Sequence, residues 1–300
     1  MEINLMERLG REVYPSGGEP CPGCGSRLGG QIILRALAKY DDVWPQGGSC
    51  GFGVGSSARS EASMGHGGGA IMGMTGASLT GLVEAMRLRG VDDTRLVIVS
   101  GEGSATSMGL GSTLHAFMRQ LPFTLIIMNN EYWAMSGYHL TDRSPLKAND
   151  KVLPLGKQQP SDPVPLLIGM SGAKYTATAT LGYPEDLVNK IDIALQHQPS
   201  YIEVLAPCEA GWRYPVGMTV ELTRLAVRTG MFPLWEWLSD EDETRFRRTV
   251  LIDEEERAPM LEYTKHQRRF QHLSEGDVAD MNAYVNTQNE LLEKMEKGFS

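Results

Sequence analysis

The feature that most constrains this chain is the placement of its four cysteines, which are spread from residue 21 to residue 208. Cys21 and Cys24 form the motif CPGCG, whereas Cys50 and Cys208 stand alone in GSCGFG and APCEAGW. Each lies beside Gly or Pro, so the backbone can fold closely around an inorganic core and direct N–H groups at its sulfur atoms. We interpret the four thiols as ligands of one [4Fe–4S] cluster, which requires a fold that brings distant segments together.

Two other interpretations remain open on cysteine spacing alone. Four thiolates also form structural zinc sites, although zinc ribbons usually supply two close pairs of ligands and only one close pair is present here. The cysteines could also be unrelated buried residues. Disulfides are disfavoured, because the start MEINLMERLG lacks the basic region and apolar run of a signal peptide.

Composition narrows the class of protein. Hydrophobic residues make up 41% of the chain, which is enough for a large buried core, and the net charge of −9 argues against a nucleic-acid-binding surface. No apolar stretch approaches the ~20 residues of a membrane span, so we expect a cytoplasmic protein without membrane contact. Glycine is crowded into residues 47–76 and 101–111, which hold 15 of the 34 glycines, and this indicates backbone packed tightly around a cofactor.

Apolar runs alternate with helical patterns along the chain, which predicts an α/β fold: a mostly parallel sheet with helices on both faces. Residues 141–165 carry five prolines and little periodicity, so we expect a long loop near the site that the strand ends build. The expected strands span residues 95–103, 123–131, 175–180 and 200–208, and the expected helices include residues 31–40, 69–89 and 184–196.

A second group of polar residues follows two of these strands. The turn Gly101-Glu102-Gly103-Ser104 ends one strand, and Asn130 follows the next strand 28 residues after Glu102. One helix joins the strands, so both tips are expected at the ligand-binding edge of the sheet. Glu102, Asn130 and a backbone oxygen near Tyr132 are the hard oxygen donors that Mg²⁺ prefers, and the glycines allow a diphosphate to approach. An ordinary tight turn or a nucleotide-binding loop would fit the first motif alone.

These motifs together carry a family resemblance over roughly residues 15–240. CPGCG, the isolated Cys50, the GEG-to-NN pair, YPEDL, SYIEVLAPCEAGWR and LAVRTGMFPLWEW resemble the β subunit of pyruvate:ferredoxin oxidoreductase, within the 2-oxoacid:ferredoxin oxidoreductases. The resemblance implies the diphosphate-binding fold of thiamine enzymes. It also implies the cofactors thiamine diphosphate, Mg²⁺ and one [4Fe–4S] cluster.

By the same matching, particular residues acquire expected roles. Cys21, Cys24, Cys50 and Cys208 would hold the cluster. Glu102, Asn130 and the main chain of Tyr132 would bind Mg²⁺, and His66 would lie near the cofactor. Trp212 is expected to pack around the cluster and shield it from solvent.

The resemblance also implies a reaction and its partners. Pyruvate or a bulkier 2-oxo acid would be decarboxylated oxidatively to an acyl-CoA and CO2, and the electrons would pass through the cluster to ferredoxin or another acceptor. An α subunit would supply the pyrimidine side of the thiamine site. Further clusters would reside in γ and δ subunits or their equivalents, since four cysteines suffice for one cubane.

The sequence departs from the family pattern at two positions. Glu102 stands where the family usually has Asp, so its carboxylate must bend back or the metal must shift. Met135 stands where pyruvate enzymes typically have a substrate-side Asn, and this apolar side chain raises the chance of a bulkier 2-oxo acid. His139, in the same loop region, is expected to border the substrate together with His66 and Met135.

The remaining alternatives concern domain organisation and function class. We expect one cofactor domain over residues 1–240 and a charged arm over residues 241–300 that packs on a partner subunit and carries no visible chemistry. The alternative enzyme is a non-redox thiamine-dependent decarboxylase with a four-cysteine zinc site. A single-cluster electron-transfer module would have no use for the Gly101-to-Asn130 motif.

Overall fold

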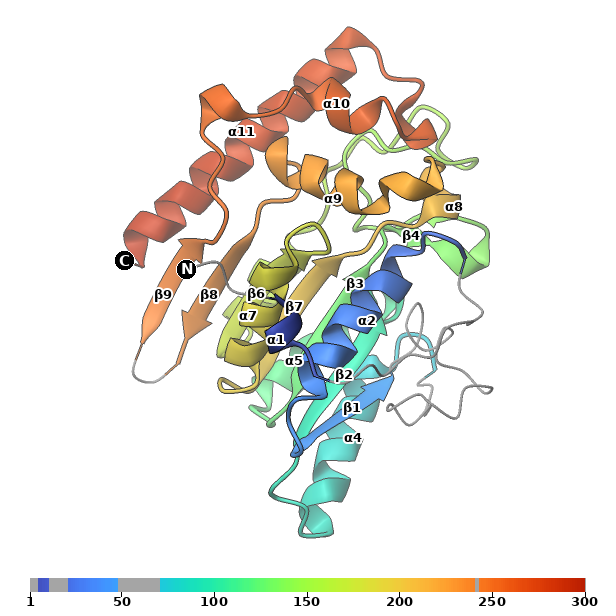
Figure 1. The fold of residues 1–300 in the computed structure, drawn as a ribbon. Helices are drawn as coiled ribbons and strands as arrows, with labels where there is room; N and C mark the ends of the chain where they lie inside the picture. Colours follow the sequence, from blue (N-terminus) through green and yellow to red (C-terminus); the bar gives the residue numbers. More distant parts are fainter. Residues whose placement is uncertain (1–4, 11–20, 48–70, 241–242, 300) are drawn as a thin grey trace.

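A computed structural model describes residues 5–10, 21–47, 71–240 and 243–299, so Cys50 and His66 lie outside the described residues. Its centre is a seven-stranded sheet of order β1-β2-β3-β7-β6-β8-β9 (Figure 1). The first five strands in this order are parallel, and β8 and β9 are antiparallel additions at one edge. The strands are β1 (Val43–Gly47), β2 (Arg95–Gly101), β3 (Thr124–Asn129), β6 (Tyr175–Thr180), β7 (Ser200–Leu205), β8 (Trp235–Ser239) and β9 (Thr244–Arg248).

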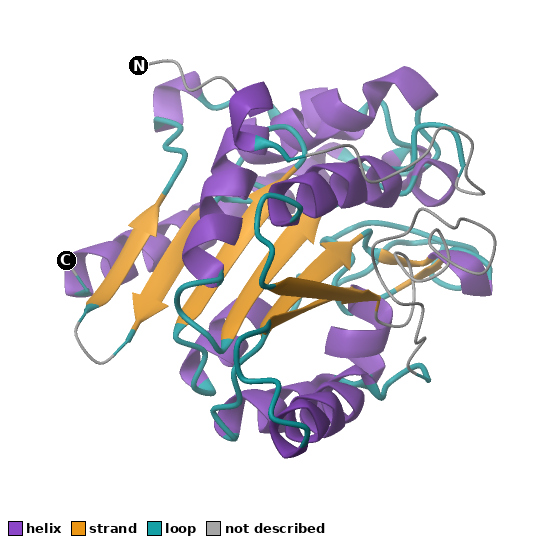
Figure 2. Ribbon diagram, turned by 60° about the horizontal axis from the view of Figure 1, so that its bottom comes forward, coloured by secondary structure: helices purple, strands orange, loops and turns teal. Residues whose placement is uncertain are grey.

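Helices cover both faces of the sheet (Figure 2). On one face pack α1 (Leu5–Arg8), α2 (Gly25–Leu37) and α7 (Pro184–Ala194), and on the other pack α4 (Thr75–Leu88), α5 (Leu110–Met118) and α6 (Val164–Met170). Successive strand residues enter opposite cores, as β2 illustrates: Val97 and Val99 join the first core, whereas Leu96 and Ile98 join the second. This arrangement confirms the predicted α/β fold with helices on both faces. No helix of the described residues is both long and apolar enough to cross a membrane.

A third core lies beyond the carboxyl ends of the strands. It is built from α8 (Glu209–Trp212), α9 (Thr219–Arg228), α10 (Met260–Thr264) and α11 (Glu275–Gly298), together with the two-stranded ribbon of β4 (Tyr132–Trp133) and β5 (His139–Leu140). Tyr132 and Trp212 are among its most buried side chains. The candidate site is therefore flanked by a packed apolar layer.

The C-terminal segment, expected as a charged arm, forms part of the fold of this chain. β9 pairs with β8 in the main sheet, and α11 buries Met281, Val285 and Leu292 against the rest of the chain. The helix begins with a capping box in which Ser274 and Asp277 satisfy each other's backbone N–H groups. Apolar residues at helical spacing thus bury one side of a charge-dense sequence. Contact of the opposite side with a partner subunit stays a prediction.

The structure differs from the expected elements at the start of α2 and at β1. α2 begins at Gly25 rather than near residue 31, because the glycines at its start allow close packing: a Cβ on Gly29 would lie 2.6 Å from Met128 Cε. β1 was not expected, because its sequence VWPQG contains the strand-disfavoured residues Pro and Gly. The predicted loop over residues 141–165 is confirmed up to the start of α6 at Val164.

Candidate active site at the carboxyl edge of the sheet

Three chain segments meet at the carboxyl ends of neighbouring strands. Gly101 at the end of β2 lies in register with Met128 of β3, and Asn129 at the end of β3 lies in register with Leu205 of β7. The turn 101–104, the loop 129–132 and the loop that carries Cys208 therefore leave the sheet side by side. The strand order reverses at this point, where α/β sheets commonly bind ligands. The predicted adjacency of the two polar tips is confirmed.

Glu102 is completely buried and bends back onto the loop after β3. Its Oε1 accepts a hydrogen bond from the Tyr132 backbone N–H at 3.1 Å, and its Oε2 accepts one from the Asn130 backbone N–H at 3.3 Å. Burial raises the pKa of this carboxyl to about 8, although the two backbone N–H groups oppose that shift. Within the described part of the chain, no cationic side chain forms an ion pair with Glu102. The site thus holds a buried carboxyl group that has no ion-pair partner among the residues the structure describes.

The loop after β3 is fixed by its own side chains. Asn130 Oδ1 accepts from the Tyr132 backbone N–H at 2.9 Å, so this side-chain oxygen points at the same group as Glu102. Between them, Glu131 adopts a left-handed conformation with φ of 62°, and its N–H donates to Asn129 Oδ1 at 3.0 Å. A non-glycine residue in this conformation needs firm support from its surroundings. The structure brings Glu102, Asn130 and Tyr132 together, as the motif predicted.

The turn after β2 is closely packed. A Cβ on Gly103 would lie 2.5 Å from the Trp133 ring, so any side chain there would displace the indole. The Ser104 hydroxyl lies 3.0 Å from the Thr75 hydroxyl and accepts from the Gly73 backbone N–H at 3.2 Å. The expected helix after the turn starts as a π-helix over Gly103–Met108 before α5. π-Helices are rare in proteins, and those that occur are often found at functional sites.

The described cysteines lie on two adjoining segments, the CPGCG turn and the loop after β7. Cys24 and Cys208 are the N-cap residues of α2 and α8, and the Gly25 N–H donates to the Pro207 carbonyl at 3.0 Å, which docks the CPGCG turn against the Cys208 loop. Cys208 Sγ accepts from the Gly211 N–H at 3.3 Å. Burial raises the pKa of the Cys208 thiol to about 11, and charge on Cys24 and Cys21 adds to this rise.

All three described cysteines are free thiols. Cys21 is exposed, whereas Cys24 and Cys208 are partly buried. Among the described residues, no three His, Cys, Asp or Glu side chains are arranged to hold a single metal ion. Cys50, the expected fourth cluster ligand, lies outside the described residues, as does His66.

The two remaining predicted residues lie on the ribbon beside the site. Met135, in the 3-10 turn Ala134–Ser136, is 68% exposed. His139 on β5 is also partly exposed, and its Nδ1 lies 3.5 Å from Asp150 Oδ2. Their substrate-side roles stay predictions.

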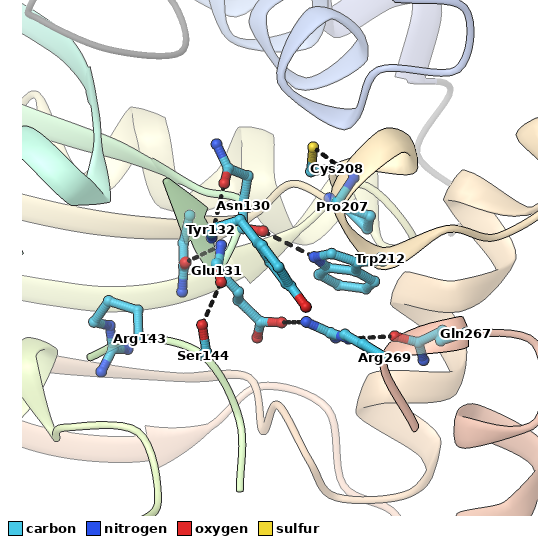
Figure 3. A network of polar contacts seen from close by, with 12 residues as sticks. Asn130, Glu131, Tyr132, Arg143, Ser144, Pro207, Cys208, Trp212, Gln267 and Arg269 are labelled. Carbon is cyan, nitrogen blue, oxygen red and sulfur yellow. Dashed lines mark hydrogen bonds and ion pairs between the residues drawn. The ribbon is translucent and has the colours of Figure 1, made fainter. Parts of the chain in front are cut away.

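A buried polar network that the sequence did not reveal supports the loop after β3 (Figure 3). Trp212 Nε1 donates to the Asn130 carbonyl at 2.8 Å, and Arg269 Nη1 forms an ion pair with Glu131 Oε2 at 2.7 Å. The Arg269 guanidinium carbon lies 3.6 Å from the centre of the Trp212 ring. Glu131 could have been noticed from its place beside the asparagines, but no sequence signal distinguishes Arg269 from the other charged residues of the C-terminal segment.

A second buried ion pair lies beneath the same loop. Glu203 on β7 is fully buried, pairs with Arg143 and accepts from Asn129 Nδ2 at 2.9 Å. The first of the two asparagines thus serves the packing of the sheet end, and the second faces Glu102.

Comparison with known proteins gives concordant matches. Residues 53–204 match the family described as thiamine pyrophosphate enzyme, C-terminal TPP binding domain. The chain is 31% identical to the pyruvate synthase subunit PorB of Methanothermobacter marburgensis, over 92% of this chain and 96% of that protein. It is 27% identical to the ketoisovalerate oxidoreductase subunit VorB of Pyrococcus furiosus, over 96% and 94% of the two chains.

A solved structure shares the fold. The 2-oxoglutarate:ferredoxin oxidoreductase from Magnetococcus marinus, with 2-oxoglutarate, coenzyme A and succinyl-CoA bound, superposes with a TM-score of 0.54 at 18% identity. The match covers 93% of this chain and 96% of that chain.

Proposed function

Because the chain belongs to the β subunits of the 2-oxoacid:ferredoxin oxidoreductase family, we propose that it carries thiamine diphosphate, Mg²⁺ and one [4Fe–4S] cluster in an enzyme that decarboxylates a 2-oxo acid oxidatively to an acyl-CoA and CO2. The observation that carries this proposal is the meeting of three segments at one sheet edge: the turn 101–104, the loop 129–132 and the Cys208 loop. The proposed oxygen ligands and the proposed thiol ligand Cys208 therefore lie on adjacent loops.

The oxygen donors suit a bound magnesium diphosphate. Glu102 is a buried carboxyl whose pKa is raised to about 8 for want of solvation, and a divalent cation would supply the counter-charge that favours its ionised form. Asn130 offers its amide oxygen beside it, and the main chain of Tyr132 is the third proposed ligand. Bound thiamine diphosphate would supply the nucleophilic carbon that attacks the 2-oxo acid, while the turn 101–104 would orient the diphosphate.

The sulfur donors suit a cluster held between two loops. Cys21, Cys24 and Cys208, with Cys50 as the fourth, are the proposed ligands, and the Gly211 N–H already points at the Cys208 sulfur. Hydrogen bonds to cluster sulfurs and exclusion of water both set the potential of such centres. Trp212, which is fully buried, would exclude water from this side.

The chain acts as one subunit of a larger enzyme. We propose that an α subunit covers the thiamine site and that subunits equivalent to γ and δ carry further clusters toward ferredoxin or another acceptor. Apolar side chains on elements bordering the site support a covering subunit: Met74, Met108 and Met135 are 47%, 62% and 68% exposed.

The substrate is proposed to be pyruvate or a 2-oxo acid with a bulkier apolar side chain. Met135 cannot donate a hydrogen bond to a substrate carboxylate or carbonyl, and its flexible thioether adapts to apolar groups. VorB is named for ketoisovalerate, a branched 2-oxo acid, so a preference of this kind occurs within the family.

The test is a substrate panel on the complex purified anaerobically with its associated subunits. Pyruvate, 2-oxoisovalerate, 2-oxoglutarate, oxalate and aryl glyoxylates are each offered with a viologen dye, with and without coenzyme A. We expect viologen reduction that requires thiamine diphosphate and is lost in Glu102→Ala. If none of these acids reduces the dye, the proposal is overturned.

A further inference from the structure

Arg269 is a buried cation beside the site whose side-chain hydrogen-bonding groups are satisfied within the chain. Its side chain is 0% exposed, and each of its nitrogen atoms has a partner. Nη1 binds Glu131 at 2.7 Å, Nε donates to Gln267 Oε1 at 2.8 Å, and Nη2 donates to the Tyr263 hydroxyl at 3.0 Å. The planar fork of arginine can serve three such directions at once, which a lysine ammonium on a flexible stem cannot reproduce.

This guanidinium joins two loops that are far apart in the sequence. One contact is Glu131, the left-handed residue between Asn130 and Tyr132. The other is the face of Trp212, which follows Cys208 in α8 and donates its Nε1–H to the Asn130 carbonyl (Figure 3). Loop 129–132, Arg269 and Trp212 thus form a closed arrangement in which each part contacts the other two.

The backbone around Arg269 reinforces this bridge. The Arg269 carbonyl accepts from the Asn149 N–H at 2.9 Å, and the Arg268 N–H donates to the Arg213 carbonyl at 3.3 Å. Main-chain bonds therefore anchor the C-terminal segment to the long loop after β5, through Asn149, and to the end of α8, through Arg213, and Arg269 cannot withdraw without disturbing them.

We infer that Arg269 is a positioning residue that holds the loop 129–132, which would bind Mg²⁺ and diphosphate, against the loop that carries Cys208. This inference rests on the proposed function, since it concerns the distance between the two proposed cofactors. The strained Glu131 backbone needs a partner to persist, and Arg269 supplies one. Loss of the bridge would let Asn130 and Tyr132 leave the positions where they face Glu102.

The test compares variants in the anaerobic complex. Arg269→Lys keeps the charge but loses the fork and its stacking. Arg248→Lys is the matched control: Arg248 lies in the same C-terminal segment and pairs with Glu296 at 2.9 Å, between β9 and α11. The readouts are the dissociation constant of thiamine diphosphate with Mg²⁺, measured by calorimetry, and the rate of cluster bleaching after rapid mixing with the 2-oxo acid.

For Arg269→Lys we expect about tenfold weaker thiamine diphosphate binding and slower cluster bleaching. A loss of this size is typical when a residue that orients the ligand-binding groups is replaced. Arg248→Lys should keep wild-type values. If Arg269→Lys assembles and also keeps both wild-type values, the inference is overturned.

A milder variant covers the case in which Arg269→Lys does not assemble. Trp212→Phe retains a ring under the guanidinium and loses only the N–H bond to Asn130. We expect it to weaken thiamine diphosphate binding about threefold, as one net hydrogen bond of ~0.5–1 kcal/mol implies. If Trp212→Phe binds thiamine diphosphate with wild-type affinity, or does not assemble, the inference is overturned and the role of Arg269 is purely structural. A wild-type complex that binds no thiamine diphosphate would instead refute the proposed function.

Discussion

Replacing Gly25 by alanine should break the contact that brings Cys24 and Cys208 together. A Cβ on Gly25 would lie 2.5 Å from the Pro207 nitrogen and 2.6 Å from the Ala206 carbonyl carbon. Both are backbone atoms, so the two segments must separate by about 1 Å to restore ordinary contact. The 3.0 Å hydrogen bond from the Gly25 N–H to the Pro207 carbonyl would be lost with that movement.

The magnitude follows from these two effects. Overpacking of a tight contact costs about 1–3 kcal/mol, and one net hydrogen bond contributes about 1 kcal/mol. We therefore expect Gly25→Ala to destabilise the chain by about 2–4 kcal/mol. Because the movement directly parts two proposed cluster ligands, we also expect loss of the cluster.

Gly81→Ala is the matched control. Gly81 also lies in a helix, α4, but a Cβ there meets nothing within 4 Å. It should be neutral or stabilise the chain by up to about 1 kcal/mol through helix propensity. Iron content, visible absorbance and thermal unfolding of both anaerobic complexes are measured together. A Gly25→Ala complex with wild-type iron content and stability would refute the reasoning.

Three further predictions concern single side chains. Burial raises the pKa of Glu102 to about 8 from an ordinary 4.5, so the cofactor-free folded state binds the extra proton and loses on the order of 3 kcal/mol of stability as pH rises from 5 to 8. Glu102→Gln should abolish that loss of stability along with Mg²⁺-dependent thiamine diphosphate binding. Thermal unfolding of both proteins is measured from pH 5 to pH 8, and the same pH dependence of stability in wild type and variant would contradict the prediction. Hydrogen bonds from Ser274, with help from Lys147, hold the pKa of Asp277 well below its usual range, so its contribution is present at neutral pH and lost on acidification. Asp277→Asn should lower the free energy of unfolding by about 1 kcal/mol at pH 7 and by progressively less below about pH 4. Denaturant titrations at pH 7 and at about pH 3 would check this difference. Met135→Asn should shift kcat/KM toward pyruvate relative to 2-oxoisovalerate by about tenfold, and an unchanged ratio would place Met135 away from the substrate.

The sequence predicted the features that depend on local patterns. Buried strands read as continuous apolar runs, and parallel strands must end at the same edge of the sheet, so the meeting of Glu102 with Asn130 followed from the run lengths and the polar residues after them. Cys24 and Cys208 lie on adjoining loops, whereas convergence of all four cysteines on one cluster stays a prediction.

Long-range packing could not be predicted in this way. The charge-dense C-terminal segment resembled a solvated arm, because charged residues are usually exposed. Arg269 is buried only through its contacts with Glu131 and Trp212, and these partners are too far away in the sequence to be recognised from it. The early start of α2 at Gly25 was missed for a similar reason: glycine opposes helix formation locally, and only the contact with Pro207 explains why it is needed there.

Metal analysis tests most directly whether this chain holds the proposed iron–sulfur cluster beside its thiamine site. Iron, labile sulfide and zinc are quantified in the anaerobically purified complex, for wild type and for Cys208→Ser. We predict that the variant loses iron and sulfide in equal amounts, about four of each per copy of this chain, without any change in zinc. Zinc in place of iron in the wild type, or unchanged iron and sulfide in the variant, would contradict the account.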